Sequence, residues 1–375
     1  VMAEFRSDNA FMFEAPYTEF DAFTSTLTTM EDQFFGPLYT AMYKSILSAN
    51  NVIENSTDAT QIGEAKFLRA LSYFKLVKSF GDVTVTLSAS PSLTDTSIFV
   101  RQPDAISALS TTIVDGRASK YAAQSLLGKV YMQMGDFVNA ETHLGAVVSG
   151  ASSAGISLKA NYNDIFGAEN EIANSEIIYS TQVSSSIVDE YTFGTDFWNW
   201  FVGDDPKSDF PVDADLVAAF DASDASGGGT DLRRAVTLSA AGTTAVKFPK
   251  DGGLGTEHDW IEIRLADVIL LYAEALNENN SPASTVLPLL DPIRTRAGLT
   301  SLTGTVTSKV NIIQTIANER RLELAFEGHR WFDLVRTNTV DAELGTTVNS
   351  NYHIFPIPVS EVLATKGVIT QNAGY

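Results

Sequence analysis

The chain has 375 residues, a formal net charge of −21 at pH 7 and no cysteine. This acidity argues against nucleic acid as a partner, because nucleic acid requires a basic surface, and it disfavours an anionic membrane surface. It would also repel a polyanionic ligand, so a neutral ligand fits better. The absence of cysteine excludes disulfides, thiol catalysis and cysteine-metal sites. The longest apolar stretch, Val268–Leu276, is too short to cross a bilayer, and no signal peptide is visible.

The N-terminal part predicts a helical hairpin. Apolar residues from Leu38 to Ile53 recur at helical spacing, which predicts the first helix. The second helix is expected to begin at Asp58, where Gln61 completes a capping pattern, and to end at Gly81. Two helices joined by so short a turn pack antiparallel.

The middle of the chain has the spacing of a tetratricopeptide repeat, which is a helical hairpin of about 34 residues. Gly128 and Ala140 are small where the two helices are expected to touch, Tyr131 fills the space beside them, and Gly135 begins the turn. A looser pair of helices is predicted within residues 263–299. Such hairpins bury their apolar faces by stacking and form scaffolds that are usually non-catalytic.

These elements predict an all-α fold made of tetratricopeptide-like helical repeats with long, loop-rich insertions. We expect one domain over residues 1–375. The helical scaffold is expected at about residues 31–82, 116–150 and 258–337, and the loop-rich part at about 84–101 and 179–257. Ser, Thr, Gly and Asp, which favour turns and loops, are frequent in both insertions.

The segment Asn318–Arg336 mixes apolar and charged residues closely. Six residues recur at the spacing of one helix face: Ile313, Ile316, Arg320, Leu324, Trp331 and Val335. This spacing predicts one helix with buried charges, and buried charges must be paired. The i, i+3 spacing favours the pairs Arg320–Glu323, Glu327–Arg330, Arg330–Asp333 and Asp333–Arg336. Gly328 lies inside this helix, which predicts either a kink or the close approach of another backbone.

This segment resembles the C-terminal signature of the SusD/RagB family. Three further stretches resemble motifs of that family, and all four follow the family's order along the chain: Ala65–Val83, Arg264–Asn277, and the tail formed by Phe355–Glu361 with Gln371–Tyr375. The resemblance implies a nutrient-binding lipoprotein on the extracellular face of the outer membrane of Bacteroidetes-type bacteria. Its membrane contact would be an N-terminal lipid anchor that is not present in this chain.

The resemblance also implies that the loop-rich part binds a glycan and that a SusC-type TonB-dependent transporter is the protein partner. Residues 106–117 form a shorter connection than the family leads us to expect, so either residues are missing there or a hairpin is truncated.

The sharpest candidate for ligand binding is the aromatic stretch Trp198–Phe201 in the longer insertion. Trp198 and Trp200 are two residues apart, so on an extended segment both rings face the same side. Flat aromatic rings cover the apolar faces of sugars, and polar neighbours bond the hydroxyl groups. The residues expected to contact a glycan here are Tyr191, Phe197, Trp198, Asn199, Trp200 and Asp204. The alternative is a small satellite core beneath a long loop.

Three residues outside this stretch complete the predicted glycan site. Trp260 precedes Arg264–Asn277, the second of the four family-like segments, at the mouth of a loop. There it is either a stacking residue or, as we favour, a staple at the entry of a helix. Phe99 and Arg101 lie in the first loop-rich stretch, where the family often presents an aromatic contact.

Asp204, Asp205 and Asp209 belong to an acidic run that is a weak candidate for calcium, whose ligands are oxygen atoms. The spacing is not that of an EF-hand loop, and a solvated surface is the preferred interpretation. We otherwise expect no metal and no cofactor.

We predict a binding protein and not an enzyme, because the sequence has no zinc-protease motif, P-loop or nucleophile elbow. Three alternatives remain at this stage. The same fold could bind a peptide or another nutrient, or the chain could be a protein-binding helical-repeat scaffold without a sugar site. The third alternative is a glycosidase, whose carboxylate pair nothing in the sequence selects.

Overall fold

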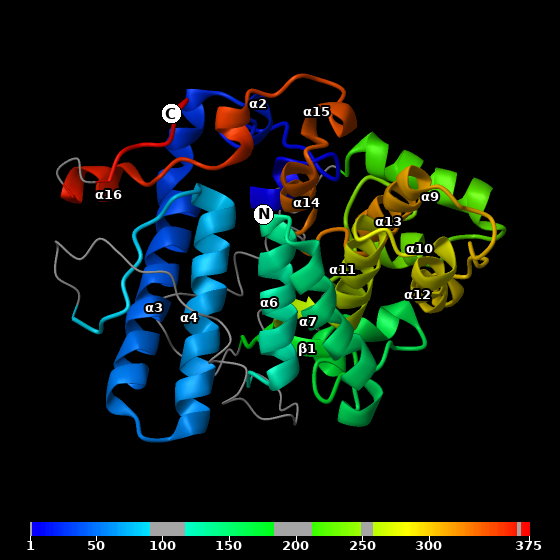
Figure 1. Cartoon of the computed structure of the whole chain (residues 1–375). Coiled ribbons are helices and arrows are strands. Elements are labelled where there is room, and N and C mark those ends of the chain that lie inside the picture. Colours follow the sequence, from blue (N-terminus) through cyan, green and yellow to red (C-terminus); the bar gives the residue numbers. More distant parts are fainter. Residues whose placement is uncertain (1, 91–116, 184–211, 249–257, 366–368) are drawn as a thin grey trace. The chain divides into compact units, whose positions relative to one another are not determined.

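The computed structural model describes residues 2–90, 117–183, 212–248, 258–365 and 369–375 (Figure 1). Helices dominate this part of the chain, and the predicted helical fold class is confirmed. The chain divides into two compact units. The first unit comprises residues 1, 3–11 and 111–331, and the second comprises residues 2, 12–110 and 332–375. The single domain over residues 1–375 stays a prediction, because a compact unit is not by itself an independently folding domain.

Two long helices form the centre of the second unit: α3 (Gly36–Asn55) and α4 (Ala59–Phe80), which run side by side in Figure 1. Asp58 caps α4, because its Oδ1 accepts hydrogen bonds from the N–H groups of Thr60 (2.8 Å) and Gln61 (3.4 Å). Gly81 ends α4 with a φ of 72°. Both predicted boundaries are confirmed.

The C-terminal tail packs on the end of α4. The N–H of Phe355 donates to the carbonyl oxygen of Ser79 at 2.6 Å. The Nδ2 of Asn372 donates to the carbonyl oxygens of Phe80 (2.8 Å) and Phe355 (2.7 Å). Helix ends leave carbonyl groups without partners within the helix, and the tail supplies two of the donors that they need.

Short helical elements complete the second unit. They are α2 (Glu19–Ala22), η1 (Ser25–Met30), η2 (Glu31–Phe35), α15 (Val340–Glu343), η6 (Ser350–His353) and α16 (Val359–Ala364). Helix α14 (Arg330–Thr337) begins in the first unit and continues in the second. Aromatic rings fill the core, where Phe20 and Phe35 are fully buried and the ring centroids of Phe35 and Phe355 lie 5.7 Å apart.

The predicted tetratricopeptide pair lies in the first unit as α6 (Lys120–Met134) and α7 (Phe137–Gly150). A Cβ added to Gly128 would lie 2.5 Å from Cγ of Leu144, so only glycine fits where these helices touch. Gly135 makes the turn with a φ of 71°, and Asp136 caps α7 by accepting from the N–H of Asn139 at 3.2 Å. The helix contact and the turn are therefore where the sequence places them.

Three further helices of the first unit follow: α11 (Leu265–Glu278), α12 (Ala283–Arg296) and α13 (Lys309–Glu323). Helix α11 packs against α7, and a Cβ on Gly145 would lie 2.9 Å from Cε2 of Tyr272. The remaining helical elements are α1 (Met2–Phe5), η3 (Ser152–Ala154), η4 (Tyr162–Ile165), η5 (Ala168–Asn170), α9 (Ala214–Gly227) and α10 (Arg233–Thr237).

A two-stranded antiparallel sheet joins β1 (Ile177–Thr181) to β2 (Trp260–Arg264), with Thr181 opposite Trp260. The sequence predicted residues 258–264 as part of the helical scaffold, and this part of the prediction is wrong. In β2, the buried residues Ile261 and Ile263 alternate with the half-buried residues Trp260 and Glu262. That period of two belongs to a strand, and it is too short to stand out in the sequence beside the long helix α11.

The signature segment is not one helix. Helix α13 ends at Glu323 and α14 begins at Arg330. Between them Phe326 and Gly328 have φ values of 65° and 76°, which a helix cannot contain. A Cβ on Gly328 would lie 3.3 Å from Cζ2 of Trp260. Gly328 therefore forms part of a turn that the Trp260 side chain covers. The prediction of a kink within one helix, or of a second backbone close to it, is wrong.

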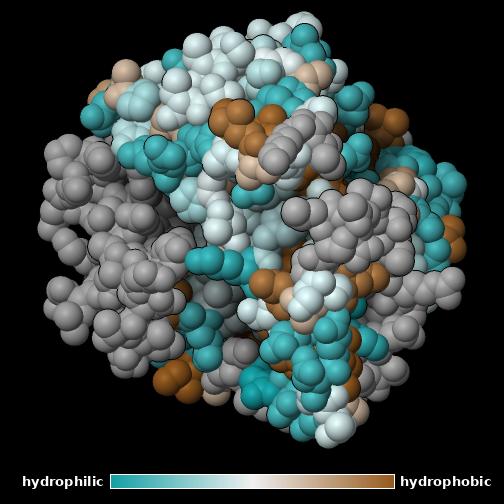
Figure 2. Space-filling model, turned by 90° about the vertical axis from the view of Figure 1, so that its left-hand side faces the viewer, coloured by the Kyte–Doolittle hydropathy of each residue, from teal (hydrophilic) through white to brown (hydrophobic). Residues whose placement is uncertain are grey.

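No helix in the described part of the chain is long and apolar enough to cross a membrane. On the face shown in Figure 2, hydrophobic residues form separate patches among hydrophilic and neutral ones. Exposed apolar residues in such scattered positions are normal on a protein surface.

Candidate functional site

Most of the predicted binding residues lie outside the described residues. These are Phe99, Arg101, Tyr191, Phe197, Trp198, Asn199, Trp200 and Asp204 for the glycan, and Asp204, Asp205 and Asp209 for calcium. Their roles stay predictions. Within the described ranges, no group of three His, Cys, Asp or Glu side chains is placed to hold a metal ion.

Trp260 is the one predicted contact that the structure describes. It is half-buried and begins β2, five residues before α11 starts at Leu265. Its indole packs on the turn at Gly328. The helix-entry staple that we favoured requires a residue directly next to the N-cap, so that interpretation is wrong. The stacking alternative for Trp260 stays a prediction.

Asp259, next to Trp260, fixes the start of the longer insertion. Its Oδ1 accepts a hydrogen bond from the N–H of Val183 at 3.0 Å, and its Oδ2 accepts from the hydroxyl of Ser180 at 3.1 Å. The N–H of Asp259 in turn donates to Oε1 of Glu171 at 2.7 Å. The carboxylate of Asp259 therefore connects Val183, the end of one described range, to residues 258–259, the start of another.

Glu171 supports this junction from a third segment. Besides the bond from Asp259, its Oε1 lies 3.5 Å from Nδ1 of His258, a side chain that is almost fully buried. Burial raises the pKa of Glu171, and hydrogen bonds from His258 and from the backbone of Asp259 oppose this effect. Neither Asp259 nor Glu171 was predicted from the sequence, because their partners are distant in sequence and no local pattern marks them.

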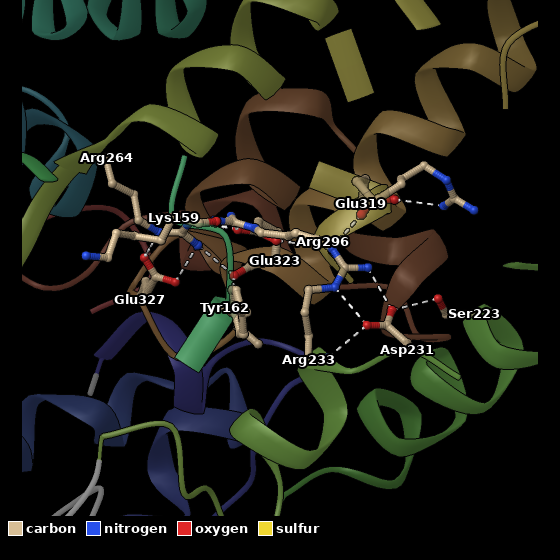
Figure 3. A network of polar contacts seen from close by, with 12 residues as sticks. Lys159, Tyr162, Ser223, Asp231, Arg233, Arg264, Arg296, Glu319, Glu323 and Glu327 are labelled. Carbon is tan, nitrogen blue, oxygen red and sulfur yellow. Dashed lines mark hydrogen bonds and ion pairs between the residues drawn. The ribbon is translucent and has the colours of Figure 1, made fainter. Parts of the chain in front are cut away.

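A second support is a network of buried charges (Figure 3). Arg264, at the end of β2, is its centre. Its Nε donates to Oε2 of Glu327 at 2.7 Å, and its Nη1 donates to Oε1 of Glu323 (2.7 Å) and Oε1 of Glu176 (2.9 Å). Its Nη2 donates to the backbone oxygen of Glu323 at 2.7 Å. The three carboxylates come from the edge of β1, from the end of α13 and from the turn that follows it.

Two other arginines extend the network toward α10 and α12. Arg233 pairs with Asp231 at 2.7 Å, with Glu323 at 3.2 Å and also with Glu319. Arg296 bonds both Glu176 and Glu323. Burial raises the pKa of Glu323, but the charges of Arg296 and Arg264 outweigh it and hold that pKa well below its usual value.

Lys247 connects the network to the longer insertion, near the end of the described range 212–248. Its Nζ donates to the backbone oxygens of Glu323 (3.1 Å) and Ala325 (2.8 Å) and to Oε1 of Glu327 (2.6 Å). All three ammonium protons are therefore used. Burial lowers the pKa of Lys247 to about 8, and the charge of Glu327 opposes this shift.

Four charged residues of the signature segment contact segments that are distant in sequence. Arg320 pairs with Asp267 at 2.9 Å, and Arg330 pairs with Asp8 at 2.6 Å. Glu323 and Glu327 bond the network described above, and the predicted pairs Arg320–Glu323, Glu327–Arg330 and Arg330–Asp333 stay predictions. The pair Asp333–Arg336 is confirmed at 2.9 Å.

The arrangement is suited to holding chain segments and not to chemistry on a substrate. Arg233, Arg264 and Glu323 are at most 1% exposed, so a dissolved substrate cannot reach them. The network and Asp259 instead hold residues 183, 247 and 258–264 in place. These residues lie at or near the ends of the described ranges that flank residues 184–211 and 249–257, where most of the longer insertion lies.

Comparison with known families and structures gave a consistent result. A model described as the SusD family matches residues 192–375, and a model described as "Starch-binding associating with outer membrane" matches residues 4–132. "SusD-like protein P25" of Formosa agariphila is 28% identical over 88% of this chain and 77% of its own length. A "SusD-like protein" of Bacteroides ovatus is 24% identical over 83% of this chain and 67% of its own length.

Solved structures agree with these relatives. A SusD superfamily protein from Parabacteroides distasonis has a TM-score of 0.79 at 20% identity, covering 100% of this chain and 93% of that one. A structure described as "Laminarin binding SusD-like protein" has a TM-score of 0.77 at 26% identity, covering 100% of this chain and 94% of that one.

Proposed function

The chain belongs to the SusD family, and from this premise we propose that it captures a neutral oligosaccharide or polysaccharide at the cell surface and delivers it to a SusC-type TonB-dependent transporter. The observation that carries the proposal is the full-length similarity to a laminarin-binding SusD-like protein, at 26% identity. The starch-binding description of the second family model supports the same ligand class. The net charge of −21 favours a neutral glycan over an acidic one.

Aromatic stacking supplies most of the affinity in this proposal. The rings of Trp198 and Trp200 cover the apolar faces of sugar units, and Tyr191, Asn199 and Asp204 contribute to hydroxyl recognition. A dissociation constant of roughly 0.1–1 mM, reasonable for a shallow sugar site, corresponds to about 4–5.5 kcal/mol. Binding of this strength suits a protein that must release its ligand to a transporter.

The proposal includes no catalytic step. In the described part of the chain, Glu323 and Glu327 are buried and paired with Arg264 in the network, where they hold the fold. The protein would act at the extracellular face of the outer membrane, attached by a lipid on an N-terminal segment.

The test is affinity electrophoresis through gels that contain laminarin, starch, alginate or pectin. We expect retardation by a neutral glucan. The double variant Trp198→Ala/Trp200→Ala should lose it, because each stacked ring contributes about 1 kcal/mol or more. The matched control Trp198→Phe/Trp200→Phe keeps two flat rings and should retain part of the retardation.

The other outcomes are equally decisive. Full retardation of the alanine double variant would move the binding site away from these tryptophans. Stronger retardation by alginate or pectin would contradict a neutral ligand. If no polysaccharide retards the wild-type protein and a peptide library binds it, the nutrient is a peptide.

A further inference from the structure

A buried polar cluster lies in the second unit, between α3, α4 and the extended chain that follows α4. Asn50 is fully buried, Arg69 is 7% exposed and Tyr73 is 9% exposed. The hydroxyl of Tyr73 donates to the backbone oxygen of Thr86 at 2.9 Å, and the N–H of Thr86 donates to that hydroxyl at 2.7 Å. The Nδ2 of Asn50 donates to the backbone oxygens of Thr86 (3.2 Å) and Ser88 (3.1 Å).

The guanidinium group of Arg69 is only partly satisfied within this cluster. Its Nη1 donates to Oδ1 of Asn50 at 2.7 Å, and this partner is a neutral amide. Its Nε is buried and has no hydrogen-bond partner among the residues that the structure describes. No carboxylate in the described part of the chain forms an ion pair with Arg69, in contrast to Arg233, Arg264 and Arg296. Burial accordingly lowers the pKa of Arg69.

A second unsatisfied group belongs to the same cluster. In the described part of the chain, the Oγ1 of Thr86 is buried without a hydrogen-bond partner, although the backbone of Thr86 is held by Asn50 and Tyr73. Buried polar atoms in proteins are almost always satisfied by protein, water or ion. Arg69 and Thr86 each contribute one unsatisfied polar atom to this cluster, and Asn50 links the two residues, because it accepts from Arg69 and donates to the backbone oxygen of Thr86.

We propose that Arg69 and Thr86 bind a small monovalent anion such as chloride. The edge of the guanidinium formed by Nε and Nη2 offers two N–H groups in a fork, and this fork suits a single anion. The hydroxyl of Thr86 adds an O–H donor, because a hydroxyl rotates to suit its partner. A water molecule would satisfy these hydrogen bonds but would leave the buried positive charge without compensation.

This site uses none of the residues assigned to sugar, although Thr86 belongs to the first loop-rich stretch, at about residues 84–101. The anion would help to hold the extended chain at Thr86 against the two helices. It would thereby stabilise the second unit in solutions that contain chloride.

Anomalous diffraction tests the location directly. Crystals grown or soaked in sodium bromide in place of chloride should show an anomalous peak in contact with Nε of Arg69 and Oγ1 of Thr86. An ordered water there without anomalous signal, or a protein side chain that fills the place, would overturn the proposal.

Thermal unfolding tests the effect on the protein. In chloride at about ten times its dissociation constant, the unfolding temperature should exceed that in equal sodium gluconate by roughly 2–4 °C. The difference between the two salts should vanish in Arg69→Gln and shrink in Thr86→Val. The second variant also keeps the test usable if the first does not fold.

Arg336→Gln is the matched control, because it removes an arginine of the same unit that already pairs with Asp333. It should keep the full difference between the salts. Equal unfolding temperatures of the wild-type protein in chloride and gluconate, or a difference that persists in Arg69→Gln, would refute the anion site. Bromide bound at Arg69 without any effect of chloride on unfolding would mark an adventitious ion only.

Discussion

The two units bury arginine in opposite ways. In the first unit, Arg264 contacts three carboxylates, from Glu176, Glu323 and Glu327. In the second unit, Arg69 contacts the neutral side chain of Asn50. The first arrangement cross-links segments that are distant in sequence. The loss of one of its charged residues leaves several opposite charges without one of their partners. The second holds a backbone through neutral groups, so its charge depends on what else is present in solution.

The largest effect is expected for Arg264→Met, which removes a charge partner from three buried carboxylates. The loss should be about 3–5 kcal/mol in the free energy of unfolding, measured by urea denaturation. Arg234→Met is the control, because Arg234 pairs with the exposed Asp221 at 3.6 Å. That change should cost less than about 1 kcal/mol. Equal costs for the two variants would mean that the network does not stabilise the first unit.

The next largest effect is expected in acid, which should lower the free energy of unfolding of the first unit. The pKa of Glu323 is lowered in the folded protein from its ordinary value of 4.5, so its contribution is fully present above that pH and is lost as the pH falls further. One such carboxylate removes about 2 kcal/mol between pH 4.5 and pH 3. Burial raises the pKa of Glu4, which acts in the opposite direction. Urea unfolding at pH 3 and pH 5 measures the net change, and equal stabilities would contradict the prediction.

A smaller effect on stability, but a clear effect on binding, is expected for Asp259→Ala. The variant removes the acceptor for Val183 and Ser180 and should cost about 1–2 kcal/mol. Retardation by the polysaccharide that binds the wild-type protein should decrease. Glu262→Ala is the control, since Glu262 lies on the same strand and accepts an exposed hydrogen bond from Thr181 at 2.9 Å. Unchanged retardation of Asp259→Ala would show that this junction does not position the binding region.

The smallest effect is expected for Arg69→Met in a buffer without chloride. No carboxylate in the described residues is stranded by this change, and only the bond to Asn50 is lost, so the cost should be about 1 kcal/mol. Urea unfolding beside Arg264→Met measures the contrast directly. A loss as large as that of Arg264→Met would show that Arg69 has an acidic partner in the folded protein.

Local chemistry made much of the fold predictable. Asp58, Gly81 and Gly135 mark helix ends because capping and positive φ values depend on one or two neighbours. Gly128 marks a helix contact because only a small residue fits there. The family resemblance read from four segments is also confirmed, since such motifs are sequence patterns by nature.

The rest depended on contacts between distant residues. Apolar spacing made Asn318–Arg336 look like one helix, but Lys247 and Arg264 bind the carbonyl and carboxylate oxygens around residues 323–327 and fix a turn there. The strand at Trp260 likewise forms only because β1 lies beside it. Of the candidate site, the tryptophans could be proposed from side-chain chemistry. Asp259 could not, because its role exists only once Ser180 and Val183 are near.

The buried network also sets an order of events during synthesis. Glu176 leaves the ribosome 151 residues before Glu327 (327 − 176), and both bond Arg264 in the folded chain. At about 5–20 residues per second, this interval lasts roughly 8–30 s. During that time the carboxylate of Glu176 stays hydrated in an unfinished chain. We therefore expect the first unit to complete its core late, after the turn that follows α13 has emerged.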